Sequence, residues 1–171
     1  MPQYSDDYIK AILRSTKVIA MVGASGNEMR PSFFAMKYLL AKGFVIHPVN
    51  PGMAGKEILG QRVYPSLKEI PAPVDMVDIF RSPEAAPGIV AEALAEKERL
   101  GIKTIWMQLG VVNEEAAEMA RAAGLAVVMD RCPKIEYGRM SGEIGWMGVS
   151  RGIIDNRKPL LFGKGGSLKR G

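Results

Sequence analysis

Small and polar residues gather in the segment GASGN, residues 23–27, directly after a run of apolar residues. Glycine lets a backbone approach a phosphate closely, and the amide groups that open a following helix favour its negative charge. Ser25 offers a hydroxyl group there, and Arg30 offers positive charge. The three glycine positions of the GxGxxG dinucleotide fingerprint are occupied by Gly23, Ser25 and Glu28. The segment therefore indicates either an altered phosphate-binding loop or a tight turn that needs glycine for packing alone.

A second candidate segment is HPVNP, residues 47–51, with Lys56 shortly after it. An NAD site usually places Asp or Glu at this point, about twenty residues past the glycines, to bind the adenine ribose. Here the first acid is Glu57, whereas Asn50, Pro51 and Lys56 suit a ribose that carries a phosphate. Coenzyme A (CoA) and NADP both have such a phosphate, so plain NAD is disfavoured. A simple turn at Asn50-Pro51 is the alternative.

Two further apolar runs end in polar residues. Phe80, Arg81 and Ser82 close the run at 74–80, and Gln108 ends the run at 104–108. In an open parallel sheet, ligands bind beyond the carboxyl ends of the strands, which is where these residues are expected.

Catalytic machinery is not evident in the sequence. The chain has one histidine, His47, which falls inside a predicted strand, and one cysteine, Cys132. These are too few thiols and imidazoles for a zinc or iron–sulfur site. No Ser-His-Asp or paired-carboxylate arrangement stands out, so we expect a binding protein with no catalytic residue and no metal.

Composition sets the class of protein. The 171 residues are 47% hydrophobic and 24% charged, as in a globular domain, and the net charge of +5 suits an anionic partner. The sequence has no dense basic stripe with interleaved aromatic residues, so nucleic-acid binding is not expected. No apolar run is long enough to cross a membrane. Residues 1–10 do not resemble a signal peptide, and a single cysteine suits a reducing compartment, so we expect a cytoplasmic protein.

The elements that must position these residues alternate between strands and helices. Strands are predicted at 17–22, 44–49, 62–64, 74–80, 104–108 and 126–129. Helical segments are predicted at 32–41, 66–70, 83–100 and 113–123. This alternation predicts a Rossmann-like, doubly wound α/β fold with a parallel sheet in one domain, residues 1–140. Residues 141–171 are rich in glycine, include a basic end, and are expected to form a tail.

Several segments together resemble a known family. VIAMVGAS, IHPVNPGMAGKEILGQRVYPSLKEIP, VDMVDIFRSPE, WMQLGV and AGLAVVMDRCPKIEYGR are similar to the small stand-alone CoA-binding domain proteins. These proteins resemble the N-terminal CoA-binding domain of the α subunit of succinyl-CoA synthetase. The similarity runs collinearly over residues 8–140. It implies a Rossmann-like fold and coenzyme A, or an acyl-CoA, as the ligand.

The resemblance also implies a place for each candidate residue. It puts Gly23, Ala24, Ser25 and Arg30 along the pyrophosphate; Asn50, Pro51 and Lys56 by the adenosine 3′-phosphate; Phe80, Arg81 and Ser82 along the nucleotide; and Gln108 nearer the pantetheine arm. The synthetase uses a phosphorylated histidine of a second domain, which this sequence does not offer, so its ligase activity is not expected here.

Two alternatives to non-catalytic CoA binding stay open. One is an NADP-dependent reductase, against which the missing third glycine and the lack of a catalytic pair argue. The other is a redox protein in which Cys132 forms a mixed disulfide with the CoA thiol. A homodimer is plausible, although no feature of the sequence requires one.

Overall fold

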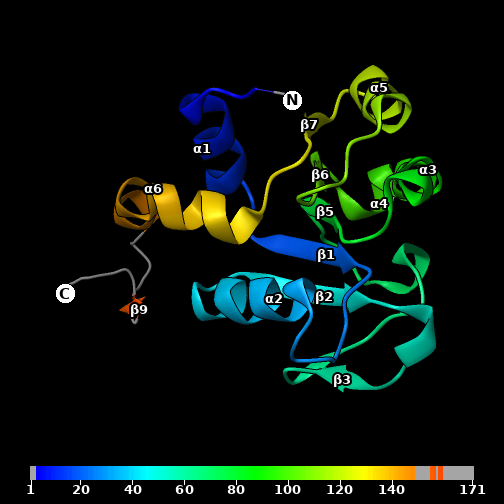
Figure 1. Cartoon of the computed structure of the whole chain (residues 1–171), viewed down its shortest axis with the longest axis horizontal. Helices are drawn as coiled ribbons and strands as arrows, with labels where there is room; N and C mark the ends of the chain where they lie inside the picture. The colour runs from blue at the N-terminus through cyan, green and yellow to red at the C-terminus, as the bar shows by residue number, and fades with distance from the viewer. Residues whose placement is uncertain (1–2, 149–154, 157, 160–171) are drawn as a thin grey trace.

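The computed structural model describes residues 3–148, 155–156 and 158–159 (Figure 1). Its centre is a five-stranded parallel sheet with the order β2-β1-β5-β6-β7. The strands are β1 (Val18–Val22), β2 (Val45–Val49), β5 (Met76–Ile79), β6 (Thr104–Met107) and β7 (Ala126–Val128). Each lies within or one residue from a run that the sequence predicts, because such Val- and Ile-rich runs suit strands buried on both faces. The expected Rossmann-like α/β fold is confirmed.

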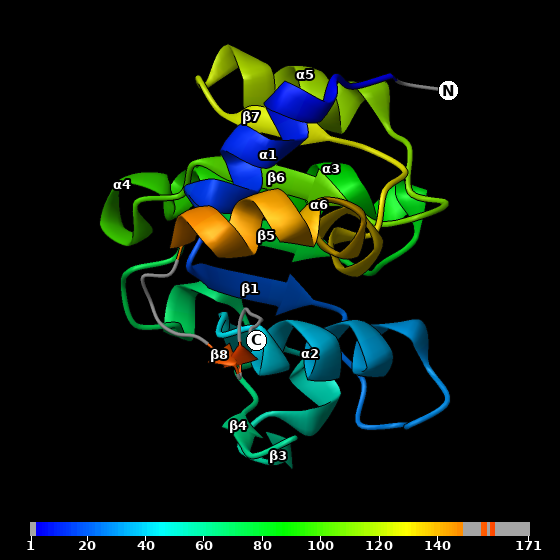
Figure 2. The same ribbon diagram turned by 90° about the vertical axis from the view of Figure 1, so that its left-hand side faces the viewer.

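Helices cover both faces of the sheet and form two separate cores. On one face, α3 (Ala86–Ala95) and α5 (Glu114–Ala122) pack against Ala20, Val77 and Ile105. The other face carries α1 (Asp6–Arg14), α2 (Pro31–Ala41) and α6 (Pro133–Gly148), which lie in front of the strands in Figure 2. Their buried side chains pack against Met21 and Trp106.

The strand order identifies where a ligand can bind. Counted along the chain, the five strands lie in the order 2-1-3-4-5, so the connections diverge between neighbours β1 and β5. The carboxyl ends of such a diverging pair form the crevice in which doubly wound proteins bind ligands. Gly23 follows β1 and Phe80 follows β5.

The segment between β2 and β5 differs from the expected short strand at 62–64. It contains η1 (Pro51–Met53), then an antiparallel hairpin of β3 (Glu57–Ile58) and β4 (Gln61–Arg62), then η2 (Leu67–Glu69). The turn at Leu59-Gly60 has two residues with positive φ, which permits a two-residue hairpin loop. The expected helix at 83–100 is divided into η3 (Pro83–Ala85), α3 and α4 (Lys97–Leu100).

The terminal helices depart most from the sequence-based expectation. No helix was predicted before residue 17, yet α1 begins at an N-cap, Ser5, whose side chain accepts a hydrogen bond from the backbone N–H of Tyr8. The expected domain boundary at residue 140 falls inside α6, which continues to Gly148. Of the expected tail, β8 (Asp155–Asn156) and β9 (Lys158–Pro159) form a two-stranded pairing, and residues 149–154, 157 and 160–171 lie outside the described part of the chain.

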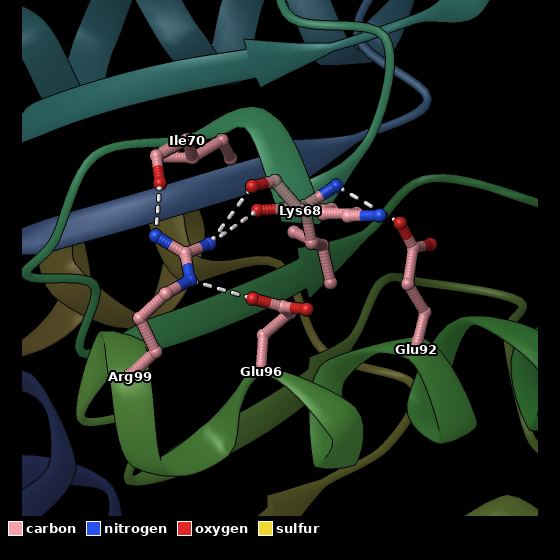
Figure 3. Close-up of polar contacts among 6 residues, drawn as sticks. Lys68, Ile70, Glu92, Glu96 and Arg99 are labelled. Atoms are coloured by element: carbon pink, nitrogen blue, oxygen red, sulfur yellow. Dashed lines mark hydrogen bonds and ion pairs between the residues drawn. The ribbon is translucent and has the colours of Figure 1, made fainter.

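Arg99 of α4 holds the η2 segment against the helices through hydrogen bonds (Figure 3). Its guanidinium donates hydrogen bonds to the carbonyl oxygens of Ile70 (2.8 Å), Lys68 (3.1 Å) and Leu67 (3.2 Å). The same group donates to Glu96 at 2.6 Å. These bonds satisfy the carbonyl groups of a short 3₁₀ turn, which has few internal partners.

Tyrosine residues bind backbone groups at both edges of the sheet. At β7, the Tyr8 hydroxyl donates to the Val127 carbonyl at 2.9 Å and accepts from the Val127 N–H at 3.0 Å. The Tyr4 hydroxyl accepts from the Met129 N–H at 2.8 Å. At β2, the Tyr64 N–H donates to the Pro48 carbonyl at 2.9 Å. Occupied edges disfavour pairing with a strand of another molecule.

Candidate functional site

Five residues form one row across the carboxyl edge of the sheet, which we call the rim row. Val22 pairs with Val49 and Ile79, and Ile79 pairs with Met107. Trp106 pairs with Val128, so the same row reaches Met129 on the last strand. One position further along each strand, the rim row consists of Asn50, Gly23, Phe80, Gln108 and Asp130. Four of these five are residues that the sequence marked as candidates. The register therefore brings together residues that are far apart in the chain.

Gly23 is the second residue of this row and lies beside Phe80, at the point between β1 and β5 where the chain connections run in opposite directions. Its φ of 92° is strained for any residue with a side chain. A Cβ atom there would lie 2.4 Å from the carbonyl oxygen of Phe80 and 2.8 Å from Cδ of Arg81. The backbone after β1 and the backbone after β5 are thus in direct contact, which only glycine permits.

Asn50 joins the first and second candidate loops. Its Nδ2 donates to the Ala24 carbonyl at 2.9 Å, and its Oδ1 accepts from the Gly52 N–H at 2.9 Å. Each end of the amide is therefore engaged within the protein. Asn50 holds the loop after β1 in place, a role that neither the fingerprint nor the spacing of the sequence revealed.

The loop after β1 is held by its own polar residues. The backbone N–H of Ser25 donates to Oγ of Ser32 at 3.1 Å, and Oγ of Ser25 accepts from the Asn27 N–H at 3.0 Å. Both hydroxyl oxygens act as acceptors here. Ser25 is partly exposed, so its O–H is available to donate to a phosphate, whereas Ser32 is buried. A Cβ at Gly26 would lie 3.0 Å from Cε of Met53, so the loop also passes close to η1 (Figure 1).

Three candidate cations lie on different loops that follow strands at the carboxyl edge of the sheet. Arg30 precedes α2, Lys56 precedes β3 and Arg81 follows β5, and all three are exposed. Within the described residues none of the three forms an ion pair, so their charges are available to an anion. Pro51 and Ser82 are also exposed and begin or cap short 3₁₀ turns.

Two positions before the rim row, on the same face of the sheet, the strands place a buried acid that was not among the sequence candidates. The register pairs Met21 with Pro48 and Asp78, and Trp106 with Asp78 and Val128. Asp78 is fully buried, and burial raises the pKa of its carboxyl group well above its ordinary value. The signal was an acid inside the apolar run VDMVDIF, whose position becomes meaningful once the register is known.

The two residues considered for chemistry are packed in the fold. His47 is half-buried on β2 and lies edge-on to the Tyr64 ring at 5.6 Å, and burial lowers the pKa of its imidazole. Cys132 is buried before α6. Among the described residues, no three His, Cys, Asp or Glu side chains are grouped so that they could hold a metal ion. Over the same part of the chain, no helix has both the length and the apolar character to cross a membrane.

The fold and the rim row define a doubly wound α/β protein with a candidate anion-binding edge. Comparison with known families is more specific, because the model of the CoA binding domain matches residues 17–138. The chain belongs to this CoA-binding domain family, which confirms the resemblance seen in the sequence.

Similar proteins include stand-alone domains and much larger ligases. The uncharacterized protein YneT of Bacillus subtilis is 40% identical over 129 residues, which cover 75% of this chain and 91% of YneT. The structure of a hypothetical protein from Pyrococcus horikoshii OT3 is 36% identical with a TM-score of 0.75, covering 83% of this chain and all of that one. An ADP-forming acetate–CoA ligase of Archaeoglobus fulgidus is 40% identical over 107 residues, which are 61% of this chain but 16% of the ligase.

Proposed function

We propose that this protein binds coenzyme A, or an acyl-CoA, along the rim row at the carboxyl edge of its sheet. The observation that carries the proposal is the rim row itself, four of whose five residues were marked as candidates, in a chain of the CoA-binding domain family. The pyrophosphate would lie against the Gly23 to Ser25 backbone, where Arg30 and Arg81 supply positive charge.

The 3′-phosphate of CoA would lie near Lys56, beside Asn50 and Pro51. Phe80 and Ser82 would flank the nucleotide, and Gln108 would lie toward the pantetheine arm. No residue is assigned a catalytic role, so the protein would hold its ligand without transforming it. The comparisons do not support an NADP-dependent reductase or a Cys132–CoA disulfide. The single cysteine also supports a cytoplasmic setting.

Lys56→Ala separates CoA recognition from general anion binding. We expect the variant to bind CoA about threefold to tenfold more weakly, a loss of about 0.7–1.4 kcal/mol. Its affinity for dephospho-CoA, which lacks the 3′-phosphate, should not change. Isothermal titration calorimetry with both ligands provides the measurement.

The matched control is Lys17→Ala, because Lys17 is exposed at the amino end of β1, on the opposite edge of the sheet. Lys17→Ala should bind both ligands like the wild type. Equal losses for CoA and dephospho-CoA in Lys56→Ala would remove Lys56 from the 3′-phosphate site. No binding of CoA by the wild type at millimolar concentration would contradict the proposed function.

A further inference from the structure

Asp78 is an unusual residue in its surroundings. The other four members of its row, Pro48, Met21, Trp106 and Val128, are buried and carry no charge. Neither carboxyl oxygen of Asp78 has a hydrogen-bond partner among the described residues. Burial without a partner strongly disfavours an ionised carboxylate, so the uncharged acid is the form that this position favours.

Gln108 also has an unpaired buried polar atom, and this atom is a hydrogen-bond acceptor. Its side chain is buried, and its Oε1 atom lacks a partner within the described chain. These two unpaired groups come from neighbouring strands, because Asp78 pairs with Trp106 and Gln108 follows Trp106 by two positions. Residues two positions apart point to the same face of a sheet, so both side chains lie on one face. Such diagonal neighbours have α-carbons roughly 7–8 Å apart, which a glutamine side chain can span.

Protonation of Asp78 would satisfy both groups together. A protonated carboxyl group has one O–H donor, and the amide oxygen of Gln108 is an acceptor. The indole of Trp106 does not compete, because its Nε1–H donates to the Arg131 carbonyl at 2.8 Å. With Oε1 turned toward Asp78, the two N–H donors of Gln108 face the rim.

We propose that Asp78 stays protonated and donates to Oε1 of Gln108, so that Nε2 of Gln108 is held toward the ligand and donates to one of its carbonyl oxygens. This inference rests on the proposed function and deepens it. Asp78 is a positioning residue, because it acts through Gln108. The ligand group recognised at this point of the rim is an acceptor, such as a pantetheine amide carbonyl or the carbonyl of an acyl thioester.

Burial is the cause that raises the pKa of Asp78, and the titratable groups packed on the same face do not change this. Those groups are Tyr137 of α6, Tyr38 of α2 and Tyr4. Glu136 of α6 and Cys132, which immediately precedes α6, are also buried. Glu136 accepts a hydrogen bond from Arg139 at 2.7 Å. None of them is a hydrogen-bond partner of Asp78.

Infrared spectroscopy of the ligand-free protein tests the donor. At neutral pH the wild type should show the carbonyl stretch of a protonated carboxylic acid, Asp78→Asn should lose it, and Gln108→Leu should shift it because the acceptor is gone. Asp130→Asn is the control: Asp130 is also buried, but its Oδ1 has a partner, because it accepts from the Gly110 N–H at 2.8 Å. It should retain the band. No such band in the wild type, or a band unmoved by Gln108→Leu, would overturn the proposal.

Calorimetry with CoA tests the consequence for binding. Asp78→Asn still offers an N–H donor to Gln108 and should bind within about threefold of the wild type, whereas Asp78→Val offers none and should bind about tenfold more weakly. Equal affinity for Asp78→Val and the wild type, or equal loss in both variants, would refute the positioning role. Because the infrared measurement needs no ligand, failure of the wild type to bind CoA would count against the proposed function alone.

Discussion

Gly23 meets two demands that only glycine can combine. It has a φ of 92°, and its α-carbon faces the backbone of the next strand so closely that a Cβ would lie 2.4 Å from the Phe80 carbonyl oxygen. Gly43, which follows α2, has a similar φ of 98° but no heavy atom within 4 Å of its Cβ position. The two glycines therefore separate the cost of the backbone angle from the cost of the close approach.

We expect Gly43→Ala to lower the free energy of unfolding by about 1–2 kcal/mol, since it has only the left-handed backbone penalty. Gly23→Ala should lose roughly 1–3 kcal/mol more, because the new methyl group forces β1 and β5 apart. Urea unfolding of both variants provides the comparison. Equal losses would show that the contact between Gly23 and Phe80 does not constrain the loop.

For individual residues, the sequence predicted part of the candidate site. The rule that ligands bind at carboxyl strand ends was enough to select Gly23, Asn50, Phe80 and Gln108. The internal bonds of Asn50 and the position of Asp78 depend on strand order and register, and these come from tertiary packing that no local spacing reveals.

Among the elements, the η2 segment depends on the neighbouring helices. A three-residue 3₁₀ turn has little stability of its own, and here Arg99 binds three of its carbonyl oxygens or those adjacent to them (Figure 3). Glu92 of α3 adds a fourth contact by accepting from the Leu67 N–H at 2.9 Å. The fork of donors in arginine fits this arrangement, and the single ammonium group of lysine does not.

Arg99→Lys should lower the free energy of unfolding by about 1–3 kcal/mol, because charge is kept while most of these hydrogen bonds are lost. The control is Glu98→Gln, which removes an exposed ion pair with Lys97 (3.1 Å) and should change stability by less than about 0.5 kcal/mol. Chemical denaturation with an unchanged m-value measures both. An Arg99→Lys variant as stable as this control would mean that the network does not hold η2.

Elements with strong local signals were predictable, and those stabilised by packing were not. The runs of Val and Ile gave the five central strands, and Asn113 marked the start of α5, where its side chain accepts from the Ala116 N–H at 2.8 Å. The β3–β4 hairpin has two-residue strands, too short for a periodic pattern to appear. In α1 the signal was present as Ser5, two acids and the buried Ile9, Ile12 and Leu13.

For the molecule as a whole, the lateral edges of the sheet differ from its carboxyl edge in the groups that they present. Tyr4 and Tyr8 bind backbone groups of the β7 edge, and Tyr64 binds the carboxyl end of the β2 edge, which disfavours pairing with another strand at these points. The loops at the carboxyl edge instead carry backbone amides, polar side chains and three exposed cations, Arg30, Lys56 and Arg81. An anionic ligand is the partner that this edge suits.

The central claim is that CoA binds at this edge, and a titration followed by backbone amide NMR tests it most directly. Addition of CoA should shift the resonances of Gly23, Ala24, Arg81 and Gln108, while amides at the amino edge, such as that of Lys103, should stay in place. Shifts confined to the amino edge or the helix surfaces, or no shifts at millimolar CoA, would contradict the account.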